Sequence, residues 1–161
     1  LFRVYRSDDV VGVELGGLLK NIIAIAAGVL DELKLGHNAK ASLITRGLQE
    51  MIRFGAACSA QKETFFGLSG MGDLMATCSS PSSRNYRLGV GLAQGLSLTE
   101  LLENQGIMAE GVRTTKLIWS LAQKLGIDMP ITEQIYAVLF ENKACKDALH
   151  ELMTRRLTSE L

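Results

Sequence analysis

The chain has 161 residues, enough for one domain with its own core, and its 17 basic side chains balance 17 acidic ones. This balance argues against nucleic acid or an anionic membrane surface as a partner, since either would call for an excess of positive charge. Three widely spaced cysteines without a C-x-x-C pair are typical of reduced, intracellular packing residues, so we expect a cytoplasmic protein.

The first ten residues carry a short strand pattern. Phe2 and Val4 alternate with Arg3 and Tyr5, and no later segment offers a strand with which they could pair. We therefore expect residues 1–10 to be the remnant of a sheet outside this chain. No charged leader followed by an apolar core opens the sequence, so nothing here predicts export.

Two long helices are expected next. Apolar residues at helical spacing predict the first over residues 11–33, and after Lys20 they surround the helix, which is typical of a core segment. Its most apolar part, residues 22–30, is about half of the ~20 residues that a membrane span needs. Gly36 as a stop and Asn38 as an N-cap predict a second, antiparallel helix that ends near Ala60.

The rest of the chain is also predicted to be helical. A glycine-rich interval at residues 67–72 precedes short helices over 73–77 and 83–94, and helices follow over 97–103, 111–126, 132–142 and 145–156. Irregular polar intervals of this kind are where functional residues concentrate. The prediction is an all-α domain over residues 11–161.

Lys20 is the first candidate functional residue. It lies in an apolar helix, where a lysine must either extend to water or have a polar partner. A partly buried lysine can exchange a proton with a substrate oxygen, as the interconversion of a carbonyl and an alcohol requires. A helix-end lysine that reaches water is an equally good interpretation of its position.

Asp73 follows the glycines and shares a helical face with Thr77. The glycines permit close backbone approach, so Asp73 could pair with Lys20. The simpler alternative is that Asp73 only caps a short helix.

The segment Ser82-Ser83-Arg84-Asn85 combines a helix start with hydroxyl, guanidinium and amide groups. Free N–H groups at a helix N-terminus and an arginine together make a compact phosphate site. A plain serine cap beside a solvated arginine is the alternative. The functional interpretation of Lys20, of Asp73 and of this segment rests on all three occurring in one chain.

Two glycine patterns imitate a dinucleotide-binding loop. Residues 89–95 lie within a helical pattern, and residues 67–72 have the wrong spacing, whereas a true loop follows a buried strand and opens a helix. We therefore reject both. No metal site is expected either, because His37 and His150 lack a partner at ligand spacing.

Four segments together resemble the C-terminal domain of NAD(P)-dependent glycerol-3-phosphate dehydrogenase, and the resemblance spans nearly the whole chain. They are residues 12–21 (GVELGGLLKN), 45–51 (TRGLQEM), 64–74 (TFFGLSGMGDL) and 82–85 (SSRN). The resemblance implies a multi-helix substrate domain of the 6-phosphogluconate dehydrogenase-like type. It also implies an N-terminal Rossmann domain, outside this chain, that holds most of the NAD or NADP.

The resemblance further assigns roles to individual residues. Lys20 matches the general acid/base and Asp73 the carboxylate that positions it and the substrate. The matched substrate-binding residues are Ser83, Arg84 and Asn85, with Asn21 and Thr77 as supporting hydrogen-bonding groups. Arg84, Met108 and Glu110 match residues that contact the cofactor.

The implied function is interconversion of dihydroxyacetone phosphate and sn-glycerol 3-phosphate, which feeds glycerophospholipid synthesis. The implied partners are the small-molecule substrate and the Rossmann domain, and a homodimer is compatible with the family. By itself the chain should not turn over. The alternatives are the substrate domain of a related two-domain hydroxy-acid or sugar-phosphate dehydrogenase, and a non-catalytic helical dimerisation module.

Overall fold

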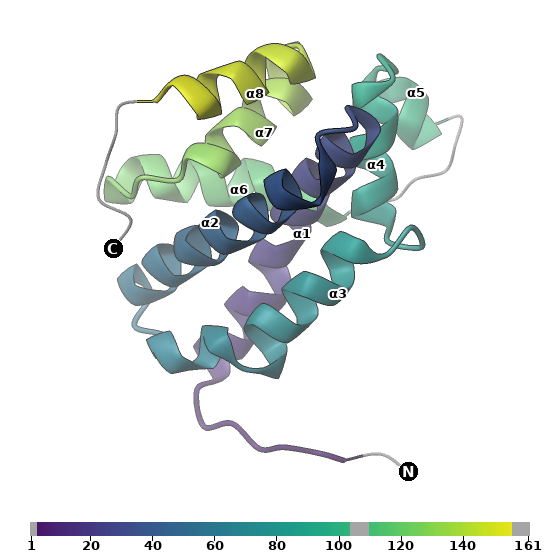
Figure 1. Ribbon diagram of the computed structural model, residues 1–161. Helices are drawn as coiled ribbons and strands as arrows, with labels where there is room; N and C mark the ends of the chain where they lie inside the picture. Colours follow the sequence, from purple (N-terminus) through teal and green to yellow (C-terminus); the bar gives the residue numbers. More distant parts are fainter. Residues whose placement is uncertain (1–2, 104–109, 156–161) are drawn as a thin grey trace.

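The computed structural model describes residues 3–103 and 110–155, and Met108 lies outside these ranges. Helices account for the regular structure of both ranges (Figure 1). They are α1 (Val10–Glu32), α2 (Gly36–Ala57), α3 (Asp73–Ser79), α4 (Arg84–Ala93), α5 (Leu98–Glu103), α6 (Glu110–Leu125), α7 (Pro130–Phe140) and α8 (Cys145–Thr154). The all-α prediction is confirmed.

Helix α1 is the centre of the fold. It packs against α2, α3, α4, α6 and α7, and Figure 1 shows it passing through the middle of the molecule. By length and composition α1 could cross a membrane, but 56% of its most apolar window is buried inside the protein. The expected core helix is therefore observed, and the other helices of the domain cover its apolar surface.

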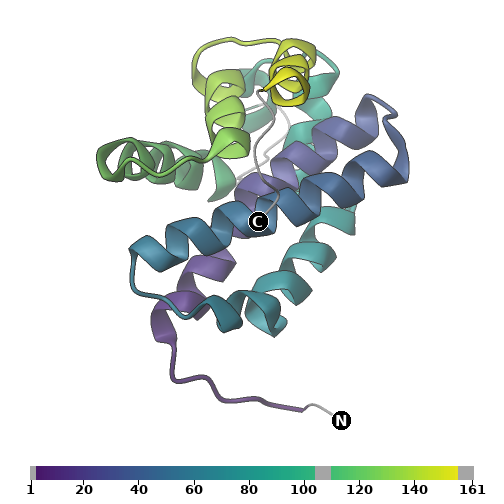
Figure 2. The same cartoon turned by 60° about the vertical axis from the view of Figure 1, so that its left-hand side comes forward.

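The α1–α2 hairpin forms as expected, although its turn differs from the prediction. Asn38 is not an N-cap, because α2 already begins at Gly36, which has the positive φ that glycine adopts without strain. Asn38 therefore lies inside the first turn of α2. Figure 2 shows the two helices side by side along most of their length.

The short strand expected at the N-terminus is wrong for the residues described. Residues 3–7 form no regular structure, because a strand needs a neighbour for its backbone groups and none is present in the described ranges. Asp9 then begins α1 as its N-cap. Its side chain accepts a hydrogen bond from the backbone N–H of Gly12 at 2.9 Å.

The glycine-rich interval forms a compact connection between α2 and α3. Residues Lys62–Phe66 make a 3₁₀ turn and Leu68–Gly72 a π-turn that leads directly into α3. This connection lies against α1. It therefore carries the start of α3 to the middle of the central helix.

Candidate active site

Lys20 and Asp73 form an ion pair, although they are 53 positions apart in the sequence. The Lys20 ammonium donates to Oδ2 of Asp73, and the two side chains are 20% and 39% exposed. Lys20 is therefore neither fully buried nor a helix-end lysine extended into water. Lys20 and Asp73 therefore pair with each other, as one interpretation of each residue expected, rather than reaching water or only capping a helix.

Close backbone packing brings this pair together. A Cβ on Gly16 would collide with the carbonyl oxygen of Ser69, so α1 approaches the π-turn more closely than any other residue would allow. Lys20 lies one turn after Gly16, and Asp73 lies four residues after Ser69. The two glycine-containing segments thus set the distance between the charged groups.

Thr77 holds the acidic side of the pair. Its hydroxyl donates to the backbone oxygen of Asp73 at 2.6 Å and also lies 3.3 Å from Oδ1 of the same residue. Oδ2 is left for Lys20. The predicted shared face of Asp73 and Thr77 is confirmed, and its effect is to orient the carboxylate.

Asn21 and Asn85 join three helices behind the ion pair. The Asn85 amide nitrogen donates to Oδ1 of Asn21 at 2.9 Å, and Oδ1 of Asn85 accepts the backbone N–H of Gly111 at 2.9 Å. Both asparagine side chains are almost fully buried. The network fixes the beginnings of α4 and α6 against α1, a role that residue types alone do not indicate.

An open hollow adjoins these groups. It is lined by Gly17, Lys20, Asn21, Ala76, Thr77, Ser80, Ser82, Ser83, Arg84, Asn85 and Glu110. All the predicted substrate-binding residues except Asp73 therefore line one surface, and Asp73 reaches it through Lys20. Gly17, Ala76 and Ser80 were not predicted to line it, because their residue types carry no group that indicates a function.

Two helix N-termini meet at the hollow. Ser83 is the N-cap of α4 and its hydroxyl oxygen accepts the N–H of Tyr86 at 3.3 Å, so the plain cap interpretation holds beside the lining role. Glu110 begins α6. Unpaired N–H groups and the helix dipole make such termini favourable places for an anion.

Arg84 and Glu110 flank the hollow as a loose pair. Their closest atoms are 3.8 Å apart, and their side chains are 54% and 73% exposed. An exposed pair at this distance is weak, so the guanidinium can turn to a ligand at little cost. The hollow thus combines a lysine ammonium, hydroxyl groups, a loosely paired arginine and the N-termini of two helices.

The rejected glycine pattern at residues 89–95 does not form a nucleotide loop. Gly89 lies within α4, where a Cβ would collide with the carbonyl oxygen of Ile25 on α1. Gly91 packs under Leu101. These glycines serve helix packing.

Comparison with known proteins agrees with this geometry. The family model described as "NAD-dependent glycerol-3-phosphate dehydrogenase C-terminus" matches residues 9–150. The chain belongs to this family. The four segments that carry the resemblance lie on α1, on α2, on the connection that leads into α3, and at the start of α4.

Individual relatives extend the match. A glycerol-3-phosphate dehydrogenase [NAD(P)+] of Citrifermentans bemidjiense is 55% identical over 99% of this chain and 48% of its own length. A crystal structure of glycerol-3-phosphate dehydrogenase from Coxiella burnetii superposes with a TM-score of 0.92 at 47% identity, over 96% of this chain and 47% of that one. The Plasmodium falciparum structure, 22% identical with a TM-score of 0.86, supports the fold alone.

The chain spans about half the length of the relatives that it matches. Activity in those relatives therefore belongs to proteins about twice as long. What this domain contributes must be argued from its own residues.

Proposed function

We propose that this domain supplies the acid–base and substrate-binding groups of a glycerol-3-phosphate dehydrogenase. The reaction interconverts dihydroxyacetone phosphate and sn-glycerol 3-phosphate with NAD(P)H or NAD(P)+. The observation that carries the proposal is the Lys20–Asp73 ion pair at the edge of a hollow that also receives the N-terminus of α4. This arrangement supports the proposal because one small molecule could contact both Lys20 and the start of α4.

Lys20 is assigned to the C2 oxygen of the substrate. In the reducing direction NAD(P)H, when bound, supplies hydride to C2, and the C2–O π electrons move onto oxygen. The Lys20 ammonium transfers its proton to that oxygen, so an alcohol forms and neutral lysine remains to be reprotonated. Asp73, fixed by Thr77, holds the ammonium in position.

The substrate phosphate is assigned to the start of α4. Ser83, Arg84 and the first N–H groups of the helix offer charge and hydrogen-bond donors, and Asn85 keeps this helix end in place. Binding the remote phosphate orients the carbonyl toward Lys20. Thr77 and Asn21 then act as supporting groups around the ion pair.

The cofactor is assigned mainly to a Rossmann domain outside residues 11–161, with residues 1–10 leading from it. The described ranges hold no strand followed by a glycine loop, which dinucleotide binding requires. Arg84 and Glu110 at the rim of the hollow fit contacts to the part of the cofactor nearest the substrate. Met108 is assigned there by resemblance. The corresponding cellular role that we propose is that of a cytoplasmic, homodimeric enzyme of glycerophospholipid synthesis.

Substitution of Lys20 in the whole protein tests the proton-transfer role. Lys20→Ala should lower kcat for glycerol 3-phosphate oxidation by about 10²–10⁴-fold, the usual worth of a general acid–base group. Thr45→Ala, at an exposed hydroxyl outside the hollow, is the matched control. Unchanged turnover in Lys20→Ala would exclude the proposed role.

A substrate panel tests the specificity. The proposal expects activity with glycerol 3-phosphate and much less with glycerol, because the phosphate contacts would be lost. Arg84→Gln should reduce this preference, whereas Arg113→Gln on the same helix as Glu110 should not. Preference for a 2-hydroxy acid or another sugar phosphate would favour a related two-domain dehydrogenase.

A further inference from the structure

Tyr86 connects the hollow around Lys20 to the far end of α1. It lies in the first turn of α4, where its N–H donates to the hydroxyl oxygen of Ser83 at 3.3 Å, and Ser83 lines the hollow. Its own hydroxyl donates to Oδ2 of Asp31 at 2.7 Å, in the last turn of α1. Tyr86 is not among the residues that line the hollow, so any effect on a ligand there must pass through the start of α4.

The start of α4 is tied to α1 at two points. Asn85 binds Asn21, and its neighbour Tyr86 binds Asp31. Asn21 and Asp31 are ten positions apart in the sequence, which is about 15 Å along a helix. Between these points the carbonyl oxygen of Tyr86 lies against Gly28, where a Cβ would be only 2.0 Å away. The glycine contact sets how closely the helices approach, whereas the two side-chain contacts on either side of it resist rotation of α4 across α1.

Lys40 completes the contact at the end of the α1–α2 hairpin. Its ammonium donates to the same Oδ2 of Asp31 at 2.6 Å and lies 5.3 Å from the centre of the Tyr86 ring, an arrangement that attracts a cation to the ring. Burial raises the pKa of Asp31, but the hydrogen bonds from Lys40 and Tyr86 outweigh burial and leave that pKa below its ordinary value. Asp31 is therefore a charged acceptor at neutral pH, and such acceptors bind hydroxyl groups strongly.

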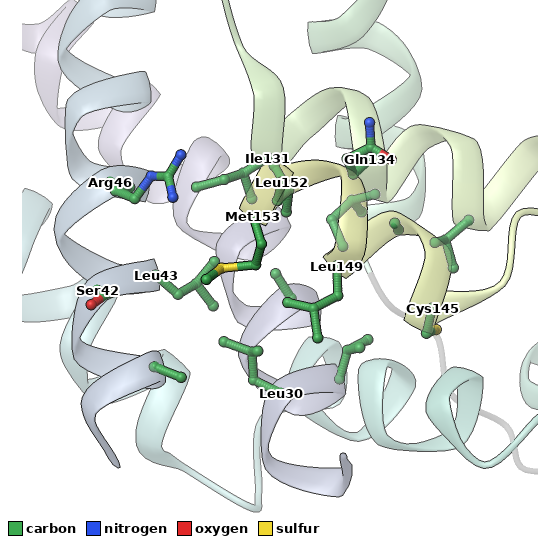
Figure 3. A pocket seen from close by; sticks show the side chains of 16 residues that line it. Leu30, Ser42, Leu43, Arg46, Ile131, Gln134, Cys145, Leu149, Leu152 and Met153 are labelled. Atoms are coloured by element: carbon green, nitrogen blue, oxygen red, sulfur yellow. The ribbon is translucent and has the colours of Figure 1, made fainter. Parts of the chain in front are cut away.

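The same end of the hairpin is packed into the core of the domain. Leu30 and Leu43 belong to this end, are 7% and 8% exposed, and are part of the core cluster. They line an apolar cavity among α1, α2, α7 and α8, and Figure 3 shows both side chains at its wall. Because the hairpin end is held by the core, it can serve as a support for α4.

We propose that Tyr86 is a positioning residue for the substrate phosphate. By tying the first turn of α4 to Asp31, it keeps Ser83 and Arg84 directed at the hollow. Proton transfer by Lys20 does not depend on Tyr86, since Lys20 is held by its ion pair with α3. The role of Tyr86 rests on the proposed function, because it needs a substrate whose phosphate binds at this helix end. Its loss should therefore weaken substrate binding and leave the chemical step intact.

Tyr86→Phe in the whole protein removes the hydroxyl and leaves the ring. KM for glycerol 3-phosphate should rise by about threefold to tenfold, because part of the free energy of a hydrogen bond to a charged group is lost from phosphate binding, while kcat should stay within about twofold. Tyr136→Phe is the matched control, because Tyr136 lies on α7 against Trp119 and Phe140 and outside the hollow. An unchanged KM, or a lower kcat in place of a higher KM, would overturn the proposal.

Substitution of Asp31 tests the other side of the contact. Asp31→Ala should raise KM by a similar factor, and Tyr86→Phe should add little in that background, because both substitutions remove the same hydrogen bond. Asp31→Asn keeps an oxygen that can accept the Tyr86 hydroxyl, so it should raise KM less than Asp31→Ala. Independent, multiplying effects of Asp31→Ala and Tyr86→Phe would show that the contact does not position α4.

Combination with Arg84→Gln separates the role of Tyr86 from the proposed function. If Tyr86 acts through the start of α4, Tyr86→Phe should raise KM by a smaller factor in Arg84→Gln than in the unsubstituted protein. The same factor in both backgrounds would mean that Tyr86 acts elsewhere. If Arg84→Gln itself leaves KM unchanged, the assignment of the phosphate to α4 is wrong and the role of Tyr86 falls with it. A raised KM in Arg84→Gln but not in Tyr86→Phe would exclude the role of Tyr86 alone.

Discussion

Asp9 and Glu50 are carboxylates with little exposed surface and similar hydrogen-bond partners, but their pKa values are shifted in opposite directions. Asp9 accepts hydrogen bonds from the N–H of Gly12, the N–H of Gln61 and the hydroxyl of Thr64, and these lower its pKa, the Thr64 contact most strongly. Glu50 also has three donors but is only 1% exposed, and burial raises its pKa to about 7. The two residues therefore stabilise the protein in different pH ranges.

Asp9 should stabilise the fold above the ordinary carboxyl range and lose this effect in acid. Its folded pKa lies below the usual 3.8, so its contribution is present above that value and disappears as pH falls through the lower one. Asp9→Asn should therefore lower the melting temperature at pH 7, with a smaller difference near pH 3. Asp8→Asn is the control, because Asp8 is exposed and its one ion pair, with Arg6 at 3.9 Å, is exposed and therefore weak. Equal effects of the two substitutions would contradict this role.

Glu50 should act in the opposite direction. It binds the N–H of Ile131 at 2.5 Å and the N–H and hydroxyl of Thr132 at 3.1 and 2.9 Å, which caps the start of α7. The folded pKa of Glu50 is about 7, whereas its ordinary value, which applies to the unfolded chain, is 4.5. Between these two pH values folding takes up a proton, so the free energy of unfolding falls as the pH rises. Over that range the decrease is about 3 kcal/mol.

Chemical unfolding of Glu50→Gln at pH 5 and pH 8 measures this effect. The uncharged amide removes the proton uptake, so the difference in unfolding free energy between the two pH values should shrink relative to the unsubstituted protein. Glu63→Gln, at an exposed position, should leave the difference intact. A difference that persists in Glu50→Gln would mean that another group titrates.

At the scale of elements, the α1–α4 contact depends on two glycines. A Cβ on Gly28 would collide with the carbonyl oxygen of Tyr86, and one on Gly89 with that of Ile25. The backbones of the two helices therefore touch. This contact sets α4, and with it Ser83 and Arg84, relative to Lys20.

Alanine at two glycines of the same helix should give opposite results. Gly28→Ala should lower the unfolding free energy by about 1–3 kcal/mol, because the added methyl group must push α4 away. Gly17→Ala has open space around the new atom and should raise stability by roughly 0.5–1 kcal/mol through higher helix propensity. Urea unfolding of both variants measures the difference. Destabilisation of equal size would show that helix packing is not the cause.

Sequence patterns predicted the helices more completely than their contacts. The spacing of apolar residues predicted the bounds of α1 and α6 to within one residue, because that spacing depends directly on which sides of a helix are buried. The start of α2 was wrong because Gly36 can begin a helix as well as end one. The Glu50 cap was not predicted, since its partners are 81 and 82 positions away and a charged residue on a helix usually faces water.

The site was predictable in part. Lys20, Asp73 and Ser83 were identified from local chemistry, but the pairing of Lys20 with Asp73 rather than water depends on how α1 meets the π-turn. The Asn21–Asn85–Gly111 network was beyond prediction for the same reason. Residue types therefore predicted the candidate functional residues. Which of these residues contact one another depends on the packing of the helices.

At the scale of the whole molecule, α1 connects two distinct regions. Its first half carries Lys20 and Asn21 to the hollow, and its second half carries Ala26, Val29 and Leu30 to the apolar cavity. Both regions therefore depend on the same central helix. The hollow is lined by a lysine, an arginine, hydroxyl groups and amides, which suit acid–base chemistry and anion binding.

The 161-residue chain alone is expected to bind glycerol 3-phosphate without oxidising it. Lys20, Ser83 and Arg84 lie on one surface, so the proposed anion site is made by this domain alone, whereas hydride transfer needs a dinucleotide fold that the described ranges do not contain. Once circular dichroism confirms helical structure, calorimetry should detect binding, and Arg84→Gln should weaken it. Assays with NAD and NADP should show no turnover, while the same assays on the whole protein do. Turnover by the chain alone would mean that its own helices bind the nicotinamide, and would replace the two-domain proposal.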